Sequence, residues 1–443
     1  MKRSATIAML VALAVAAAGA QTAAGSAQAP TVSEKRDIAV FALGYYGWNI
    51  PLEALGSIDA EIQKVFVDLG RFNIIGVTQR MSSGGLQDFI GAVKKVKSEN
   101  LTIPEKYQFG EAIFTEAEFN RLLGAFVVAV PVVSSFISEW NYQSGQWTAD
   151  IKTNVTFIDV SSGGSVLGVA QVATTGRDNG SQLAAVEGAI EAIPVQLQFE
   201  IRKITAFQIN TRILATSGGE VRIQLGADMG LKKGDEYSVI RATMLQGLRD
   251  EREVGLVLIK DVGPQISTGV VLYGGAEITA DAQLREVPRL GVDVEPFFSY
   301  LSGPVHVMPG MRFVPSRGFY GFRPYATVEI PIGVQTNIYG IAVLPVNVVV
   351  GGQYDLHLGR LTFSPCAGVG LSYIYGVEGL TSSNSSSNYL SHLGVQALFQ
   401  ISWLNSRDMR IYIEGGGEYW ASISSFFDPY YGLSAGVGLA WKL

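Results

Sequence analysis

The sequence predicts a multidomain chain: an α+β domain, then a small all-β module, then an eight-stranded antiparallel transmembrane β-barrel. Three observations lead to this fold class. Long strands with strict two-residue alternation fill the region after residue 290, charged residues are scarce, and the amino terminus has the pattern of an export signal.

The barrel is predicted from strands in which every second residue is apolar. Between residues 431 and 443 one face is uniformly apolar, while the other holds glycine, serine, alanine and one lysine. The same pattern recurs between residues 361 and 376 and between 389 and 404. We predict that ten side chains from these strands face the membrane: Leu393, Val395, Phe399, Ile401, Trp403, Leu433, Val437, Leu439, Trp441 and Leu443.

The length of the strands favours a barrel that spans the membrane. A spanning strand needs about 9 to 11 residues, whereas strands of soluble proteins cluster near 5 or 6. Aromatic residues gather at the strand ends, and a tight turn at 405–408 contrasts with a long polar loop at 376–389. A soluble β-sandwich also alternates and is the alternative.

Eight strands are predicted in the region 290–443. An even number is required if the preceding domains and the carboxy terminus lie on the same side of the membrane. The strands are expected near 291–300, 305–314, 322–333, 339–358, 361–376, 389–404, 409–422 and 430–443. Eight strands leave an interior that side chains fill. We therefore expect a plugged lumen in which polar inward residues pair, namely Asp293, Glu295, Gln400, Arg410, Glu414 and Glu418.

The composition is consistent with a lipid-facing surface and argues against nucleic-acid binding. The 443 residues carry a net charge of −6, which provides no basic field for a polyanion. Hydrophobic residues make up 48% and charged residues only 16%, and a soluble chain usually has about 25% charged residues. Apart from the amino-terminal stretch, the sequence has no run of the roughly 18 apolar residues that a spanning helix needs.

The amino terminus predicts export. Lys2 and Arg3 precede an apolar run, and the small residues at 18–20 form a cleavage site, with a second candidate ending at residue 29. We expect residues 1–20 to be a signal peptide, and the mature chain to lie in the outer membrane of a Gram-negative-type cell with its amino-terminal domains in the periplasm. The single cysteine, Cys366, cannot form an internal disulfide, and we expect it to fill space in the tightly packed interior of the barrel.

Residues 36–200 predict the α+β domain. Strands are expected at 37–43, 72–78, 126–140, 146–160 and 165–174, with helices at 58–69, 85–98 and 116–123, the last capped by Thr115. A final helix from 181 to about 197 is expected to bury one apolar face, formed by Leu183, Val186, Ile190, Ile193 and Val195 or its neighbours.

Residues 204–288 predict the small module. Short strands recur at intervals of roughly ten residues, and this spacing indicates a small β-barrel, or SH3-like, fold.

These two regions resemble known envelope domains. The succession of segments at 36–41, 69–80, 124–130 and 155–166 is similar to the periplasmic domain of the curli-secretion protein CsgG, the penicillin-binding-protein activator LpoB, the amino-terminal domain of TolB and the middle domain of the flagellar protein FlgT. Segments 226–235 and 254–262 resemble the carboxy-terminal domain of FlgT-type proteins. The resemblance implies a non-enzymatic envelope component, and several members of that group assemble into rings. The chain lacks the lipoprotein cysteine of the secretion and activator branches, and FlgT-type proteins lack the barrel.

No catalytic, cofactor or metal site is predicted. The three histidines, His306, His357 and His392, have no ligand spacing. The glycine-rich segment 226–234 lacks the Lys-Ser/Thr ending of a phosphate loop and reads as a turn between strands. Asp355 with His357, or Asp428, could be imagined as the polar pair of a hydrolase, but nothing in their spacing supports it.

The function expected from these features is a non-enzymatic assembly or scaffold protein. The barrel would anchor it in outer-membrane lipid, and residues 36–288 would dock envelope proteins or further copies of the chain. The alternative is a component of a secretion or transport pore. An outer-membrane hydrolase or acyltransferase, and an adhesin displaying the Ser/Asn-rich loop 381–388, are weaker alternatives.

Overall fold

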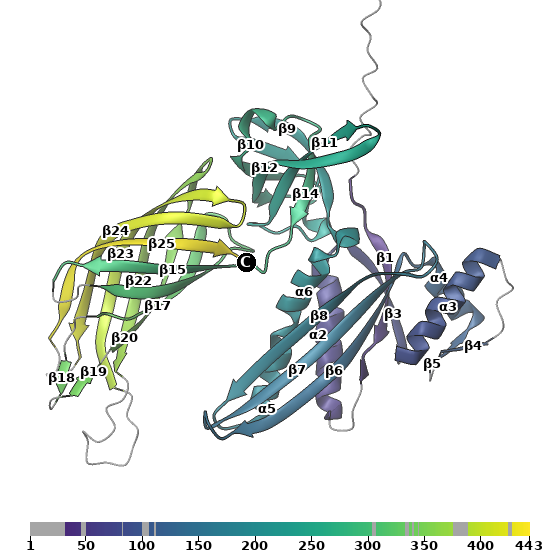
Figure 1. Cartoon of the computed structure of the whole chain (residues 1–443), viewed down its shortest axis with the longest axis horizontal. Coiled ribbons are helices and arrows are strands. Elements are labelled where there is room, and N and C mark those ends of the chain that lie inside the picture. The colour runs from purple at the N-terminus through teal and green to yellow at the C-terminus, as the bar shows by residue number, and fades with distance from the viewer. Residues whose placement is uncertain are drawn as a thin grey trace, which may run out of the picture.

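The computed structural model describes residues 32–45, 50–81, 83–99, 106–109, 112–303, 307–332, 336–338, 341–343, 345–374, 389–423 and 428–443. Three modules follow one another along the chain: a mixed sheet with helices, a small closed barrel and a larger closed barrel (Figure 1). The predicted signal peptide at 1–20, His306 and most of the loop predicted at 376–389 lie outside the described residues.

The first module is built on a sheet whose central strands are apolar on both faces. Its strand order is β3-β1-β6-β7-β8, with β2 also paired to β6. The β1–β3, β1–β6 and β2–β6 pairs are parallel, and the β6–β7 and β7–β8 pairs are antiparallel. The strands are β1 (Arg36–Ala42), β2 (Gly44–Tyr45), β3 (Phe72–Arg80), β6 (Val127–Asn141), β7 (Gln146–Asp159) and β8 (Ser165–Asp178). A separate hairpin is formed by β4 (Lys106–Phe109) and β5 (Ala112–Thr115).

Helices cover both faces of this sheet. Ile38 and Val40 of β1 pack into one core with α2 (Leu52–Leu69), α5 (Gln182–Glu191) and α6 (Ile193–Lys203). The alternate residues, Ala39 and Phe41, pack into a second core with α3 (Ser83–Glu99) and α4 (Glu116–Gly124). The predicted cap of α4 is confirmed: Thr115 Oγ1 accepts from the Glu118 backbone N–H, and the Glu118 carboxylate accepts from the Thr115 N–H.

The single helix predicted from 181 to about 197 is wrong in two respects. It is divided at Ala192 into α5 and α6, with a proline in the first turn of α6. Leu183, in the first turn of α5, was expected to be buried but is 61% exposed. In α6 the neighbours Ile193 and Leu197 are buried, and Val195 itself is 54% exposed.

The second module is a closed barrel with the strand order β10-β13-β12-β11-β14-β9. Its strands are β9 (Asn210–Ser217), β10 (Glu220–Ile223), β11 (Glu236–Leu245), β12 (Leu248–Val262), β13 (Ser267–Tyr273) and β14 (Gln283–Val287). Three short 3-10 helices accompany them, η1 (Thr205–Phe207), η2 (Ala227–Met229) and η3 (Gly275–Glu277). The glycine-rich segment 226–234 is a connection between β10 and β11, as predicted, and contains η2.

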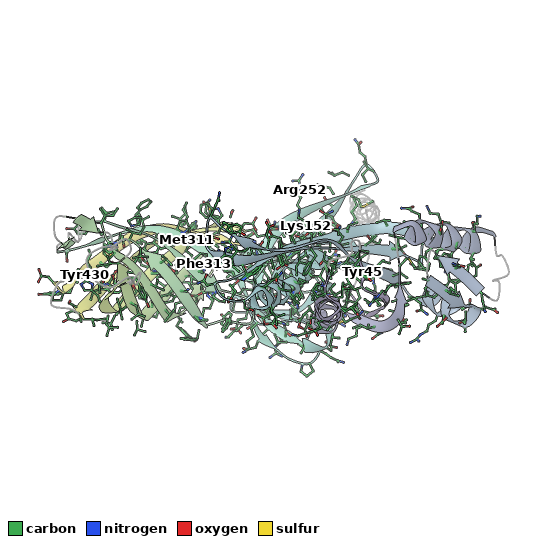
Figure 2. All side chains as sticks on the ribbon, turned by 90° about the horizontal axis from the view of Figure 1, so that it is seen from below. Tyr45, Lys152, Arg252, Met311, Phe313 and Tyr430 are labelled. Atoms are coloured by element: carbon green, nitrogen blue, oxygen red, sulfur yellow. The ribbon has the colours of Figure 1, made fainter. Side chains whose placement is uncertain are left out.

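The β11–β12 hairpin extends beyond this small barrel as an arm. Figure 1 shows the arm projecting from the module, and Figure 2 shows Arg252 on it. Met244, Leu245 and Leu248 at its tip are 55–75% exposed.

The third module confirms the predicted barrel of eight antiparallel strands. The ring runs β15-β16-β17-β20-β22-β23-β24-β25 and closes between β25 and β15. The strands are β15 (Val292–Leu301), β16 (Met308–Pro315), β17 (Phe322–Glu329), β20 (Pro345–Tyr354), β22 (Leu361–Ile374), β23 (Tyr389–Ser406), β24 (Met409–Ser422) and β25 (Tyr430–Lys442).

The continuous strand predicted at 339–358 is wrong. Its first part belongs to a separate hairpin of β18 (Thr336–Ile338) and β19 (Ile341–Val343), and β20 begins at Pro345, which has no N–H to continue a ladder. Its last part is the short β21 (Leu356–Leu358), which pairs with β22 beyond Asp355. Among the helices of the described residues, none is both long and apolar enough to cross a bilayer.

Candidate membrane interface, barrel lumen and domain junction

The outer surface of the large barrel is a continuous apolar face. Cross-strand register places directly paired residues on one face, so Phe298, Val437 and Ile413 of three neighbouring strands all point outward. Along the described parts of all eight strands, the outward positions that follow from this register carry no Asp, Glu, Lys or Arg. Exposing an uncharged apolar surface of this extent to water is unfavourable, whereas a lipid bilayer would cover it.

The ten side chains predicted to face the membrane all lie on the outside of this barrel. Eight of them are 43–74% exposed in the isolated chain: Leu393, Val395, Phe399, Trp403, Leu433, Val437, Trp441 and Leu443. Ile401 and Leu439 are half-buried between their neighbours. Figure 2 places Met311 and Phe313, two further outward residues, on the same barrel. Their contact with lipid is a proposal.

The inside of the barrel is filled by charged side chains that pair with each other. Arg312 lies 2.9 Å from Glu414 and 3.7 Å from Glu295, and all three side chains are 1% exposed. Gln400 donates to Glu295 at 3.5 Å. Because an unpaired buried charge costs several kcal/mol, this triad stabilises the lumen only while all its members are present.

A second charged cluster lies nearer the junction with the small barrel. Arg323 contacts Asp293 at 2.9 Å and Asp355 at 2.5 Å, and Arg410 also pairs with Asp293. Asp355 accepts further hydrogen bonds from Gln353 and Ser364. Arg410 and Asp293 both belong to the set of inward residues predicted to pair, although the prediction did not assign partners within that set.

Sequence reasoning missed Arg312 and Arg323 as partners in these two clusters. Both arginines could have been predicted to lie in the lumen. Side chains of a membrane-spanning strand alternate between lipid and lumen, and a charged side chain is placed in the lumen. The remaining predicted lumen residue, Glu418, accepts from Trp420 Nε1 at 3.3 Å in the half of the barrel away from the junction. Figure 2 places Tyr430 at the same distant end.

The structure does not assemble the imagined hydrolase pair. Asp355 belongs to the arginine cluster, whereas His357 Nδ1 contacts Thr362 Oγ1 at 3.1 Å. His392 contacts Ser391 and the Asp428 carbonyl, so the Asp428 contact involves the backbone and not its carboxylate. No group of three or more His, Cys, Asp or Glu residues that could hold a metal ion occurs within the described ranges.

The small barrel covers the end of the large one. A cavity of about 40 Å³, room for a very few water molecules, is lined by Asp293, Arg323 and Asp355 from the lumen and by Glu236, Leu258 and Leu272 from the small barrel. Leu256, Leu272 and Val287 also form an apolar cluster with Leu404 of β23. This end of the lumen is therefore closed by the neighbouring module.

A buried carboxylate joins the first two modules. Glu286 of β14 accepts from Arg71 at 2.7 and 2.9 Å, from Arg202 of α6 at 2.5 Å and from the Ile209 N–H at 3.1 Å. Burial by itself raises the pKa of Glu286, but the two guanidinium groups outweigh burial and lower this pKa to about 2. The carboxylate is therefore charged and fully paired at neutral pH.

Further ion pairs connect the small barrel to the large one. Asp235 lies 3.3 Å from Arg202 and 2.8 Å from Arg317, which belongs to the β16–β17 turn. The neighbouring Glu236 pairs with Arg289 at 2.9 Å and with Lys442 of β25. Burial by itself raises the pKa of Glu236, but the positive charges of Lys442 and Arg289 lower this pKa by a larger amount, so the net shift is downward. Arg289 also forms an ion pair, at 2.7 Å, with Asp408 in the β23–β24 turn.

Two glycines allow the backbones of the first two modules to touch. Gly70 ends α2 with φ 68°, and Gly230 ends η2 with φ 76°. A Cβ on Gly230 would lie 1.9 Å from the Leu69 carbonyl oxygen, and one on Gly70 would lie 2.6 Å from the Gly230 nitrogen. Together with the buried ion pairs, this contact fixes the orientation of the small barrel against the α+β module.

Comparison with known proteins gives no family for the chain. No protein-family model matches it, and no curated protein matches it. The resemblances to CsgG-type and FlgT-type domains therefore remain predictions.

Similar solved structures include two barrels and a lipoprotein. The amino-terminal β-barrel domain of OprF from Pseudomonas aeruginosa is 11% identical, with 34% of this chain and 96% of that chain covered and a TM-score of 0.24. Neisserial surface protein A is 11% identical over 34% of this chain and 94% of its own, with a TM-score of 0.25. Lipoprotein GNA1162 from Neisseria meningitidis is 9% identical over 37% and 97%, with a TM-score of 0.21.

Proposed function

We propose that this protein is a non-enzymatic scaffold of the cell envelope, anchored in the outer membrane by its eight-stranded barrel. The observation that carries the proposal is the distribution of charge on that barrel. Outward positions of the described strands lack charged residues, while Arg312, Arg323 and Arg410 point inward and are paired. A barrel in water would need the opposite arrangement.

The proposed orientation puts both amino-terminal modules in the periplasm. The chain enters the barrel at Val292 and leaves it at Lys442, and the two strands pair side by side next to the small barrel. Connections at this end are short, as between β23 and β24, whereas β22 and β23 at the other end are separated by residues 375–388. Short periplasmic turns and longer external loops are typical of outer-membrane barrels. A signal peptide at residues 1–20 would deliver the chain there.

An anchor agrees better with the lumen than a pore does. The interior is occupied by linked arginine and carboxylate clusters, and the end nearest Asp293 is covered by the small barrel. A pore would need these charges to separate and the whole amino-terminal body to move. We expect almost no conductance from the purified protein in planar bilayers.

In the proposed scaffold role, residues 36–288 bind the partner proteins. Buried ion pairs fix the small barrel to its neighbours, so a partner bound there would be held at a set position relative to the membrane. The resemblance to CsgG-type and FlgT-type domains, whose relatives work in envelope assemblies, supports a protein partner or further copies of the chain.

The test is crosslinking in whole cells. A photoreactive amino acid is placed at exposed positions of residues 36–288, for example at Leu183 or Leu248, and crosslinked species are identified after extraction in mild detergent. Specific adducts with an envelope protein or with a second copy are expected. A chain that yields no adduct from any such position, or that is recovered in the soluble fraction, would contradict the proposal.

A further inference from the structure

The end of the α+β module that lies farthest from the small barrel carries a groove that the fold leaves open. It is formed by the start of α2, by α5 and by residues 136–139 of β6, and these elements lie together at the bottom of Figure 1. Its volume is about 740 Å³, within the range of binding sites. Ala54, Val186 and Ile190 form a buried apolar floor, while Leu183 and Ile137 are 61% and 50% exposed at its walls.

The same groove contains a strand edge without a described neighbour. On this side of β6, β1 pairs with residues 127–129 and β2 with Val132 and Val133. Beyond Val133 no residue of the described ranges pairs with β6 on this side, although β6 continues to Asn141. The carbonyl of Ser138 instead accepts from the side chain of Gln182 at 3.3 Å. Unpaired strand edges of this kind are templates for a further strand.

The charge of the groove is of one sign. Glu53, Glu139 and Glu187 line it, and no lysine or arginine is among the residues that line it. No ion pair within the described residues involves any of these three carboxylates. The groove thus combines a strand edge, an apolar floor and an uncompensated negative rim.

We propose that this groove binds an extended, basic segment of a partner protein, which adds a strand to the edge of β6 that no described residue pairs with beyond Val133. Side chains alternate along an added strand, so one set lies on the apolar floor while the other, carrying lysine or arginine, reaches the carboxylates. The backbone pairs with β6 from about residue 135 to 140 and displaces the Gln182 side chain from the Ser138 carbonyl. The inference rests on the proposed docking role and assigns it a surface and a class of ligand.

The experiment uses the full-length protein in detergent micelles and a peptide probe. The probe is a strand-length peptide of about eight residues that alternates lysine and valine, and its control alternates glutamate and valine. Binding is measured by fluorescence anisotropy of a label on the peptide. We expect the lysine peptide to bind at least about tenfold more tightly than the glutamate peptide, and its affinity to fall with salt.

Two variants distinguish binding of the lysine peptide in the groove from its nonspecific electrostatic attraction to an acidic protein. Leu183→Arg places a cation inside the groove and should weaken the lysine peptide by at least about tenfold. Leu248→Arg, at the exposed tip of the β11–β12 arm, adds the same charge elsewhere and should leave binding unchanged. Both residues are more than half exposed, so neither substitution is expected to unfold the chain. Equal affinities of the two variants would overturn the proposal.

Hydrogen exchange tests the strand itself. Amides of residues 135–140 should exchange more slowly with the lysine peptide bound, and binding without this protection would refute strand addition. A dimer that Leu183→Arg converts to a monomer would show that a second copy fills the groove, which also refutes the proposal. If the peptide fails to bind while crosslinks through residues 36–288 persist in cells, this surface is wrong and the docking role stands. If the crosslinks are absent as well, the docking role itself fails.

Discussion

Replacing Glu286 by glutamine should loosen the junction between the α+β module and the small barrel. The glutamate titrates at a pKa of about 2 instead of the usual 4.5. At 1.36 kcal/mol per pH unit this difference corresponds to about 3 kcal/mol of folding free energy at neutral pH. An independent comparison agrees, since removing one partner of a buried ion pair costs roughly 3 to 5 kcal/mol. Within the described residues, Glu286→Gln leaves Arg71 without a charged partner and leaves Arg202 with Asp235 alone.

The pH dependence has a definite sign. The pKa of Glu286 is lower in the folded protein than its usual value, so the contribution is fully present above about pH 4.5 and is lost as the pH falls toward 2. The difference in stability between the original chain and Glu286→Gln should therefore be constant from neutral pH to about 5 and shrink at lower pH.

Hydrogen exchange followed by mass spectrometry measures this effect in the full-length protein in detergent. A loss of about 3 kcal/mol should speed the slowest amides of β9 and β14 by on the order of 100-fold. The control is Glu277→Gln, which breaks an exposed pair with Arg241 whose side chains are 48% and 51% accessible. Such a surface pair contributes about 1 kcal/mol or less. If both variants changed exchange equally, the reasoning about burial would be refuted.

Three further predictions concern the barrel and the module contact. Val437→Arg, at an outward position of β25, should cost about 2 to 4 kcal/mol of barrel stability in liposomes, measured by urea titration; an unaffected midpoint would show that this position does not meet lipid. Arg312→Met should cost at least about 3 kcal/mol by isolating Glu295 and Glu414, and adding Glu295→Gln and Glu414→Gln should recover most of it; the absence of recovery in melting experiments would contradict the charge argument. Gly230→Ala should disrupt the backbone contact with Leu69 and speed exchange in α2, whereas Gly218→Ala, also at positive φ but in open space, should change only its own turn; similar effects of the two would refute the close-packing explanation.

The barrel was accessible to sequence reasoning because one physical rule governs it. Alternation along a strand fixes which side chains point outward, so Val395 and Val437 could be placed without knowing their neighbours. The partners of the inward residues were harder to predict. Pairing Arg312 with Glu414 requires the register around the ring, and register is set by contacts between strands far apart in the sequence.

The junction and the groove were not predictable for a related reason. Arg71 follows α2 in an ordinary turn, and nothing local indicates that Glu286 will lie beside it more than two hundred residues later. Leu183 was placed in the core because it shares helical spacing with Val186 and Ile190, but it lies in the first turn of α5, where it borders the groove and is not covered. Both features arise from tertiary packing, which periodicity does not describe.

The ring closes by pairing β15 with β25, and Lys442 of β25 is the residue whose ammonium meets Glu236 of the small barrel. A barrel that has not yet sealed cannot present that ammonium at the right place, so the module seated over its mouth would lack one of its attachments. Closure of the ring and full attachment of the small barrel are therefore coupled through Lys442. A partner that recognises the two barrels in this arrangement would bind chains whose large barrel has closed in preference to chains whose barrel is still open.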